Sequence, residues 1–288
     1  MSNLAARVLF AVVAIPVVLA LVYAGGLALA LLLAVAGALG SWEYYRIARA
    51  AGYTPLEPAG ILVALLLPPA VHLYRLGWFD PPVLTLAAVL VLIVFALTIW
   101  TRGVDGRPVG AAATTVFGVL YASGMLTFAY GLRYHTYAVG ARAGTVLLLY
   151  PLALTWISDT AAYFVGRSVG RHKLIPSVSP GKTVEGAVGA LVCCAAASWA
   201  YARWVLPPLA FLGVHAGTAI LIGIVLSAAV QLGDLAESLI KREAGVKDSS
   251  HLIPGHGGVL DRLDGMLFAL PVAYLLLTYP HVLFPAIR

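Results

Sequence analysis

The chain has 288 residues, of which 61% are hydrophobic and 10% are charged, and its mean hydropathy is +0.95. An ordinary soluble domain needs a charged surface, so this composition excludes one and predicts an integral membrane protein. The formal net charge of +6 calls for no nucleic-acid partner, because membrane proteins gather basic residues on the cytoplasmic side, beside anionic lipid head groups.

The predicted elements are membrane-spanning helices. A helix needs about 20 mostly apolar residues, at 1.5 Å each, to cross about 30 Å of hydrocarbon. The sequence therefore predicts an all-α polytopic membrane protein with about nine transmembrane helices. In chain order they are 8–24, 27–45, 60–74, 83–100, 109–132, 144–165, 184–204, 211–232 and 263–279. The third is short and contains Pro68 and Pro69, and the ninth has Asp264 near its start.

The basic residues predict how these spans are oriented. With nine spans, 13 of the 18 Lys and Arg residues lie on the side of the N-terminus and of the connections after even-numbered spans. The positive-inside rule places this side, with the N-terminus, in the cytoplasm. Two spans separate the most charged connections, 166–183 and 241–262, so both share that face. The first span lacks a following cleavage site, and we expect it to be retained.

The acidic residues are unevenly distributed. Residues 1–143 contain Glu43, Glu57, Asp80 and Asp105, each near a span end or in a connection, which is typical of a scaffold. Residues 144–288 contain the other eight acids. We therefore interpret the first part as an N-terminal transmembrane scaffold and the second as a C-terminal transmembrane catalytic region.

Asp159 lies inside the sixth predicted span. An aspartate in the middle of a span is unfavourable by about 2.5–3.5 kcal/mol, so it should face a polar partner or a water-filled cavity. The alternative is a purely structural contact between helices.

The stretch SPGKTVEG (179–186) precedes the seventh span. It is not a phosphate-binding P-loop, because the first glycine of that pattern would fall at Pro176 and no strand precedes it. We interpret Ser179 as the N-cap and Pro180 as the first residue of the helix, with Lys182 and Thr183 in the first turn. Free backbone N–H groups, the helix dipole and a lysine would then suit phosphate. The alternative is that Lys182 only contacts lipid head groups.

Carboxylates gather where the eighth span ends and the ninth begins. If the eighth helix continues outward, Asp234, Ser238 and Lys241 share one face, and Gly245 ends the helix. Asp261 and Asp264 share a face of the last helix.

Three carboxylates so placed would repel without a cation, and hard oxygen ligands suit Mg²⁺. His251 and His256 favour no zinc site, because no cysteine partner or HExxH pattern accompanies them. We interpret His256 as a hydrogen-bond donor or a loop-shaping residue. Together with nearby basic residues, the carboxylates and metal would hold a polyphosphate at the membrane surface. These basic residues are Lys182, Lys241, Arg242, Lys247 and Arg262.

The C-terminal region resembles the signature of phosphatidate cytidylyltransferases, also called CDP-diacylglycerol synthases. The matching positions are Ser238, Lys241, Arg242, Lys247, Asp248, Pro254, His256, Gly257, Gly258, Asp261, Arg262 and Asp264. The stretch 179–186 is similar to an upstream motif of the family, which more commonly has a lysine where Gly181 stands. The resemblance covers roughly residues 155–265.

This resemblance implies a membrane enzyme that converts phosphatidate and CTP into CDP-diacylglycerol and pyrophosphate, with Mg²⁺ as cofactor. Family members are polytopic and are thought to act as homodimers, and aspartates matching Asp234 and Asp261 hold their metal. We expect the protein to lie in a lipid bilayer, namely the bacterial cytoplasmic (inner) membrane, with its active site facing the cytoplasm.

The residue roles follow as hypotheses. The metal ligands are Asp234, Asp261 and a weaker third, Asp264. The catalytic set is Asp234, Asp261, Lys241 and Lys182, and the residues contacting phosphates are Lys182, Lys241 and Arg242. The hydroxyl donors are Ser179 and Thr183. Lys247, Asp248 and Arg262 organise the loop between the eighth and ninth spans or contact substrate. Asp159 is a partner to one of the basic residues.

Other function classes fit less well. A secondary transporter would show matching broken segments in two halves near the bilayer midplane, and this chain lacks that symmetry. An acid-lined channel is disfavoured because the carboxylates lie at span ends. A CDP-alcohol phosphatidyltransferase would need a DGxxAR pattern, which DGRPVG (105–110) does not supply. A CTP-dependent lipid kinase, acting at the γ-phosphorus, is the nearest alternative.

Overall fold

The computed structural model describes residues 3–78, 80, 83–253 and 257–279. The chain forms two compact units. Unit 1 comprises Met1–Tyr130 and Ile240–Arg262, and unit 2 comprises Gly131–Leu239 and Leu263–Arg288. Two long helices, α10 and α11, pass from one unit into the other.

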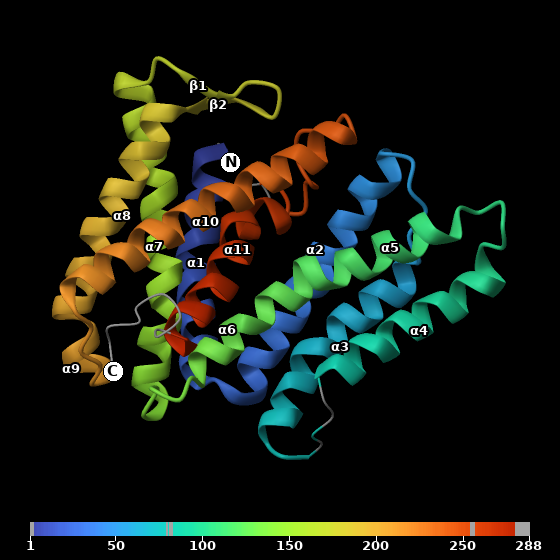
Figure 1. Ribbon diagram of the computed structural model, residues 1–288, viewed down its shortest axis with the longest axis horizontal. Coiled ribbons are helices and arrows are strands. Elements are labelled where there is room, and N and C mark those ends of the chain that lie inside the picture. Colours follow the sequence, from blue (N-terminus) through green and yellow to red (C-terminus); the bar gives the residue numbers. More distant parts are fainter. Residues whose placement is uncertain (1–2, 79, 81–82, 254–256, 280–288) are drawn as a thin grey trace. The chain divides into compact units, whose positions relative to one another are not determined.

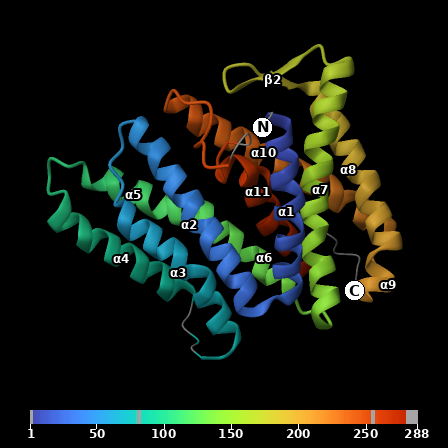
Figure 2. The same ribbon diagram turned by 180° about the vertical axis from the view of Figure 1, so that it is seen from behind.

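Unit 1 is a bundle of helices (Figures 1 and 2). Its helix α2 packs against α1, α3 and a π-helical turn, η1, and α4 packs against α5. The elements are α1 (Asn3–Ala24), α2 (Gly26–Ala50), α3 (Glu57–Arg75), α4 (Val83–Thr101), α5 (Pro108–Gly118), η1 (Val119–Gly124) and α6 (Met125–Arg133), which continues into unit 2.

Glycines bring the helices of unit 1 close together around Tyr45. A Cβ atom on Gly60 or Gly118 would overlap the Tyr45 ring. The phenol in turn donates a hydrogen bond of 2.7 Å to the carbonyl of Thr115. Tyr45 is fully buried, so this bond satisfies the one polar group of a large core side chain.

Unit 2 contains two long packed helices and a small hairpin. Helix α7 packs along α8, and the antiparallel strands β1 and β2 connect them (Figures 1 and 2). In the hairpin, Lys173 pairs with Thr183 and Ile175 with Ser179. The elements are α7 (Gly140–Val169), β1 (Lys173–Ile175), β2 (Ser179–Thr183), α8 (Val184–Trp204), α9 (Leu206–Ala210), α10 (Ala216–Glu243) and α11 (Leu260–Thr278).

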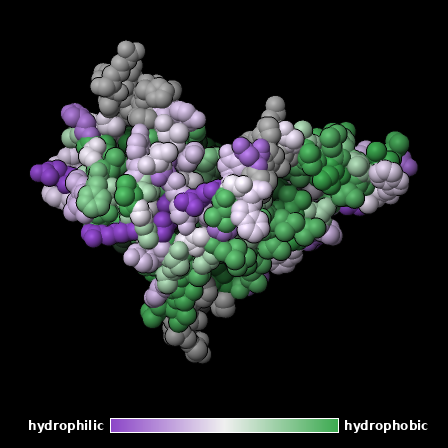
Figure 3. All heavy atoms as spheres, turned by 90° about the horizontal axis from the view of Figure 1, so that it is seen from below, coloured by the Kyte–Doolittle hydropathy of each residue, from purple (hydrophilic) through white to green (hydrophobic). Residues whose placement is uncertain are grey.

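Six of the described helical segments are long and apolar enough to cross a membrane, which confirms a multi-pass membrane protein. They are Gly26–Ala50, Glu57–Arg75, Pro108–Arg133, Gly140–Val169, Val184–Trp204 and Ala216–Glu243. Val12–Ala24 and Ala87–Thr101 are shorter apolar helices. Large apolar side chains are exposed in both units, for example Leu92 and Val192, and Figure 3 shows extensive hydrophobic surface on one face.

Nine spans were predicted, and six described segments meet the length and hydropathy needed for a span. The bounds agree for some helices and differ for others. The seventh prediction, 184–204, has the bounds of α8, whereas α10 continues 11 residues beyond the predicted end at 232. The ninth corresponds to α11, a described helix that carries Asp261, Arg262 and Asp264 in its first two turns and is not among the six. The all-α class is confirmed apart from the small hairpin. Nine spans and a cytoplasmic N-terminus stay predictions.

Candidate functional site

The hairpin corrects the predicted start of the helix after residue 178. Ser179 is not an N-cap and Pro180 does not begin a helix, because Ser179–Thr183 forms strand β2. Thr183 is the N-cap of α8 instead: its backbone is extended, and its hydroxyl accepts a hydrogen bond of 3.2 Å from the N–H of Gly186. Lys182 therefore lies on a strand that leads into the helix and not in its first turn.

Glu185, in the first turn of α8, holds the base of the hairpin. Its carboxylate accepts hydrogen bonds from the backbone N–H of Arg171 (3.0 Å) and of His172 (3.2 Å). His172 Nδ1 lies 2.6 Å from Glu185 Oε1. Between the two strands of the hairpin, Lys173 Nζ donates a hydrogen bond to the carbonyl of Pro180 (2.8 Å). These contacts fix the position of the strand that carries Lys182.

A cavity of about 610 Å³ lies within unit 2. Lys182 Nζ lies 2.6 Å from Asp234 Oδ2, and this ion pair joins the hairpin to α10. Asp159, from α7, also lines this cavity. The lining residues are Asp159, Ala162, Tyr163, Gly166, Arg167, Leu174, Ser179, Gly181, Lys182, Thr183, Gly186, Ala187, Gln231 and Asp234. The structure thus brings together five of the predicted site residues.

Asp234 is accessible to a ligand in this cavity. Its side chain is 34% exposed and that of Lys182 is 25% exposed. Its second oxygen, Oδ1, accepts a hydrogen bond of 3.4 Å from the hydroxyl of Ser238, one turn later. Because α10 runs to Glu243, Asp234, Ser238 and Lys241 lie on one continuous helix, as predicted. Gly245, with φ of +68°, follows the helix end.

Three residues that line the cavity were not predicted from the sequence. Arg167 Nη1 donates a hydrogen bond of 2.7 Å to the phenol oxygen of Tyr163, one turn earlier on α7. Gln231 Nε2 donates to the carbonyl of Ala187 at 3.3 Å, linking α10 to α8. The spacing of Tyr163 and Arg167 from Asp159, four and eight residues, would have placed all three on one helix face.

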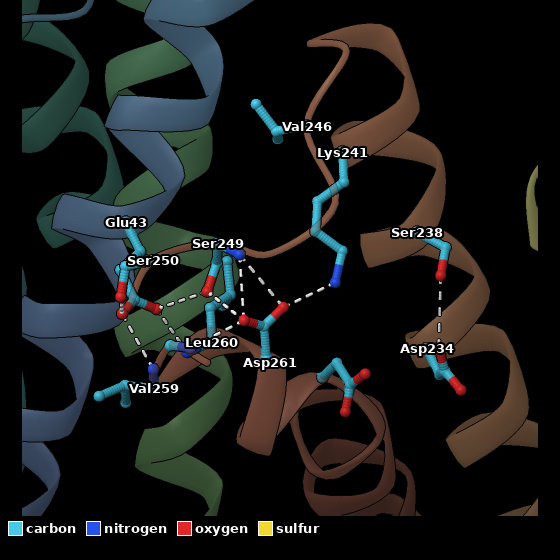
Figure 4. A network of polar contacts seen from close by, with 12 residues as sticks. Glu43, Asp234, Ser238, Lys241, Val246, Ser249, Ser250, Val259, Leu260 and Asp261 are labelled. Atoms are coloured by element: carbon cyan, nitrogen blue, oxygen red, sulfur yellow. Dashed lines mark hydrogen bonds and ion pairs between the residues drawn. The ribbon is translucent and has the colours of Figure 1, made fainter. Parts of the chain in front are cut away.

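A second group of predicted residues lies in unit 1, around Asp261 (Figure 4). Lys241 Nζ lies 2.7 Å from Asp261 Oδ1, with side chains 11% and 7% exposed. The backbone N–H groups of Ser249 (3.0 Å) and Gly258 (2.8 Å) donate to Oδ2, and the Ser249 hydroxyl oxygen lies 2.9 Å from it. Burial raises the pKa of Asp261, but the hydrogen bonds from Lys241 and Gly258 outweigh it and lower this pKa to about 2.

Glu43, in α2, belongs to the same network and was interpreted from the sequence only as part of the scaffold. Its carboxylate accepts hydrogen bonds from the hydroxyls of Ser249 (3.0 Å) and Ser250 (2.5 Å). It also accepts from the backbone N–H of Val259 (2.9 Å) and Leu260 (2.6 Å). More than 200 residues separate Glu43 from these partners, so no local sequence pattern links them.

The remaining predicted residues are more dispersed. Arg242 Nη1 donates to the carbonyl of Val246 (3.3 Å), while Lys247, Asp248 and Arg262 are exposed. Asp264 Oδ1 accepts a hydrogen bond of 2.7 Å from the next N–H, that of Gly265. His256 lies outside the described residues.

The predicted metal ligands fit Mg²⁺ unequally. Asp234 lines a cavity with hard carboxylate oxygens of the kind that Mg²⁺ prefers, although its Oδ2 is paired with Lys182. Asp261 is surrounded by hydrogen-bond donors that already use both of its oxygens. Within the described part of the chain, no three His, Cys, Asp or Glu residues form a group that could hold a metal. A shared metal centre of Asp234, Asp261 and Asp264 stays a prediction.

Comparison with known proteins decides the family. A family model described as the cytidylyltransferase family matches residues 5–280. The chain belongs to the cytidylyltransferase family. Among similar proteins, the phosphatidate cytidylyltransferase of Haemophilus influenzae is 45% identical over 151 residues, covering 49% of this chain and 48% of that protein. That of Staphylococcus haemolyticus is 42% identical over 139 residues, or 46% of this chain and 50% of the relative.

The chain thus spans about half the length of the relatives it matches. The family match, in contrast, covers nearly all of this cytidylyltransferase family member and includes residues of both units. Both the Lys182–Asp234 pair and the Lys241–Asp261 pair therefore fall inside the family region.

Proposed function

We propose that this member of the cytidylyltransferase family transfers the cytidylyl group of CTP to phosphatidate, giving CDP-diacylglycerol and pyrophosphate in phospholipid biosynthesis. The observation that supports it most is the Lys182–Asp234 ion pair on a cavity of about 610 Å³. This volume lies within the range of small-molecule sites, about 300–1,000 Å³. A cavity with cationic and anionic side chains suits a charged nucleotide.

The proposed reaction is an in-line displacement. A phosphate oxygen of phosphatidate forms a bond to the α-phosphorus of CTP. The bond from that phosphorus to the oxygen bridging towards the β-phosphorus breaks, and pyrophosphate leaves with the electron pair. The phosphate of phosphatidate is largely ionised near neutral pH, since the second pKa of a phosphomonoester is about 6. The reaction therefore needs no dedicated general base.

The harder task is to bring two anions together. Lys182, on the hairpin, and Arg167, on α7, place positive charge at the cavity and would lower the repulsion between the substrates. Ser179 and Thr183 add hydroxyls on the same strand. Lys241 and Arg242, at the end of α10, are proposed as further phosphate contacts.

We propose Mg²⁺ as the cofactor, with Asp234, Asp261 and Asp264 as its ligands. When bound, Mg²⁺ would neutralise phosphate charge and stabilise the leaving pyrophosphate. Lys241 would first have to leave Asp261, because Lys241 Nζ lies 2.7 Å from one of its oxygens. In that case the released lysine becomes available to a phosphate.

The lipid substrate explains the membrane setting. Its acyl chains would remain in the bilayer while the head group enters unit 2 from the side. We propose the cytoplasmic membrane with the site facing the cytoplasm, and the homodimer stays a prediction.

The decisive test uses purified protein in detergent with phosphatidate, Mg²⁺ and CTP labelled at either the α- or the γ-phosphorus. We expect label in the lipid product only from the α-position. Label from the γ-position would identify a lipid kinase instead, and no labelled lipid from either would contradict both activities.

A charge substitution tests the cavity assignment. We expect Asp234→Asn to lower kcat for CDP-diacylglycerol formation at least about 100-fold, the usual effect of removing one electrostatic group from a catalytic site. Asp105→Asn, an exposed aspartate in the connection between α4 and α5, should retain wild-type turnover. Turnover of Asp234→Asn within threefold of wild type would contradict the assignment.

A further inference from the structure

Glu43 is a fully buried carboxylate with a complete set of hydrogen-bond donors (Figure 4). Each of its oxygens accepts two hydrogen bonds. Oε1 accepts from the Ser250 hydroxyl and the Val259 N–H, and Oε2 accepts from the Ser249 hydroxyl and the Leu260 N–H. A buried carboxylate is costly unless it is paired in this way, so Glu43 fixes the groups around it.

Two of those donors belong to the beginning of α11. The first N–H groups of a helix have no partner inside the helix and carry partial positive charge. Here the N–H groups of Val259 and Leu260 meet a carboxylate that comes from α2. Glu43 thus binds the first N–H groups of α11, which begins one residue before Asp261.

Ser249 connects Glu43 directly to Asp261. Its hydroxyl oxygen lies 3.0 Å from Glu43 Oε2 and 2.9 Å from Asp261 Oδ2. Ser250 is comparably buried, and among the hydrogen bonds of the described residues its hydroxyl donates to Glu43 and accepts from the Leu252 N–H, with none to Asp261. The two neighbouring serines therefore differ in the one contact that joins the two carboxylates.

Gly258 shows how closely these groups pack. A Cβ atom at this position would overlap the Ser249 hydroxyl and lie 2.6 Å from either oxygen of Glu43. The backbone N–H of Gly258 donates to Asp261. Only a residue without a side chain lets the backbone reach Asp261 while Glu43 stays in place.

We infer that Glu43 is a positioning residue for Asp261, acting through Ser249 and through the start of α11. This inference deepens the proposed cytidylyl transfer and rests on it for its catalytic consequence. Glu43 is fully buried, so we expect it to act on the reaction only through Asp261. It holds the aspartate in the orientation in which it meets Lys241, and in which it would meet the proposed metal.

The two serines supply a matched test of the catalytic consequence. Ser249→Ala should lower kcat at least about tenfold, with the KM values for CTP and phosphatidate within threefold of wild type. Ser250→Ala removes a hydrogen bond to the same carboxylate and should lower kcat clearly less. Equal losses in the two variants, or a loss confined to KM, would overturn the inference, because a purely structural role predicts no difference between the serines.

A second measurement does not depend on activity. Glu43→Gln keeps the size of the side chain but replaces one carboxylate oxygen by an amide NH₂ group. This donor would face an N–H and a hydroxyl that both donate to Glu43 in the wild type. We expect hydrogen exchange at Val259 and Leu260 to become at least about tenfold faster in this variant. The control is Glu57→Gln, which removes a carboxylate paired with Arg49 elsewhere in unit 1 and should leave these amides unchanged.

These measurements separate the two possible failures. Unchanged exchange in Glu43→Gln would refute the positioning role whatever the enzyme catalyses. Faster exchange in a protein whose wild type makes no CDP-diacylglycerol would refute the proposed function and retain the structural link. If Glu43→Gln does not fold, exchange at the same amides in Ser249→Ala and Ser250→Ala decides the question. Exchange faster than in the wild type is expected in both, because each variant removes one hydrogen bond to Glu43, and unchanged exchange in both would refute the positioning role.

Discussion

Lys241 and Asp261 form an ion pair in which both side chains are almost completely buried. Burying two charges has a large desolvation cost, which their attraction and extra hydrogen bonds must offset. Asp261 receives those extra bonds from Ser249 and Gly258. Removing one partner should therefore be more harmful than removing both charges, because the single change leaves a buried charge without its counterion.

The pair predicts a specific pattern of stabilities. Lys241→Met should lower the free energy of unfolding by about 3–5 kcal/mol, the usual cost of breaking a buried pair from one side. Lys241→Met combined with Asp261→Asn should recover part of that loss, as measured by denaturant unfolding in detergent. Arg242→Met, an exposed neighbour, should change stability by less than about 1 kcal/mol. A double variant less stable than Lys241→Met would contradict this account.

Single residues were predictable where membrane physics singles them out. An acid inside an apolar span is costly, which predicts a polar partner or a cavity for Asp159, and Asp159 lines a cavity. Glu43 is also an acid near the end of a span, yet its role depends on partners more than 200 residues away. An acid at the edge of an apolar run is usually exposed to solvent. Only the tertiary structure shows that Glu43 is instead a buried carboxylate with several hydrogen-bond donors.

Among the elements, long helices were predictable and the hairpin was not. Apolar length placed the span 184–204 on α8, but the helix itself was predicted to begin earlier, at Pro180. The polar outer part of α10 required the assumption that the helix continues. Strands β1 and β2 are short and polar, and Pro180 and Gly181 are unusual in strands. Both Ser179 and Thr183 are good N-cap residues, so composition alone could not choose between them.

Helices α10 and α11 approach each other closely in unit 2, and this contact predicts the effect of adding a side chain there. A Cβ atom on Gly233 would lie 2.5 Å from the backbone carbonyl of Asp264 and 3.1 Å from Cα of Gly265. Backbone cannot yield as a flexible side chain does, so Gly233→Ala should separate the helices and destabilise the protein by about 1–3 kcal/mol. Gly110→Ala in α5 meets open space and should be neutral or slightly stabilising.

Thermal unfolding in detergent compares the two alanine variants directly. Because Asp234 follows Gly233 on α10 and lines the cavity, we expect Gly233→Ala also to reduce turnover. Equal unfolding temperatures for Gly233→Ala and Gly110→Ala would show that the two helices do not depend on close approach at this point.

For the whole molecule, composition determined the class and the family match determined the kind of enzyme chemistry to test. Hydrophobicity sufficed to predict a multi-pass membrane protein, because only helices of about 20 apolar residues satisfy their backbone within a bilayer. It did not determine the number of spans. Helix α11 has two acids and an arginine near its start, and α1 and α4 include shorter described apolar segments.

The orientation of the protein in the membrane can be tested on α7 alone. This helix has 30 residues and is about 45 Å long, enough to cross the hydrocarbon, and it ends shortly before the hairpin. Ser177, in the hairpin turn, and Thr136, before the start of α7, are both exposed. In a background lacking Cys193 and Cys194, each position can receive a single cysteine.

We expect a membrane-impermeant thiol reagent added to intact cells to label Thr136→Cys and to leave Ser177→Cys unlabelled until the membrane is opened. The reason is that CTP is a cytoplasmic nucleotide, so the hairpin that carries Lys182 must face the cytoplasm, as the distribution of basic residues also predicts. Labelling of both in opened membranes controls for reactivity. The opposite pattern in intact cells would place the cavity on the outer side, where CTP is not supplied, and would exclude the proposed reaction.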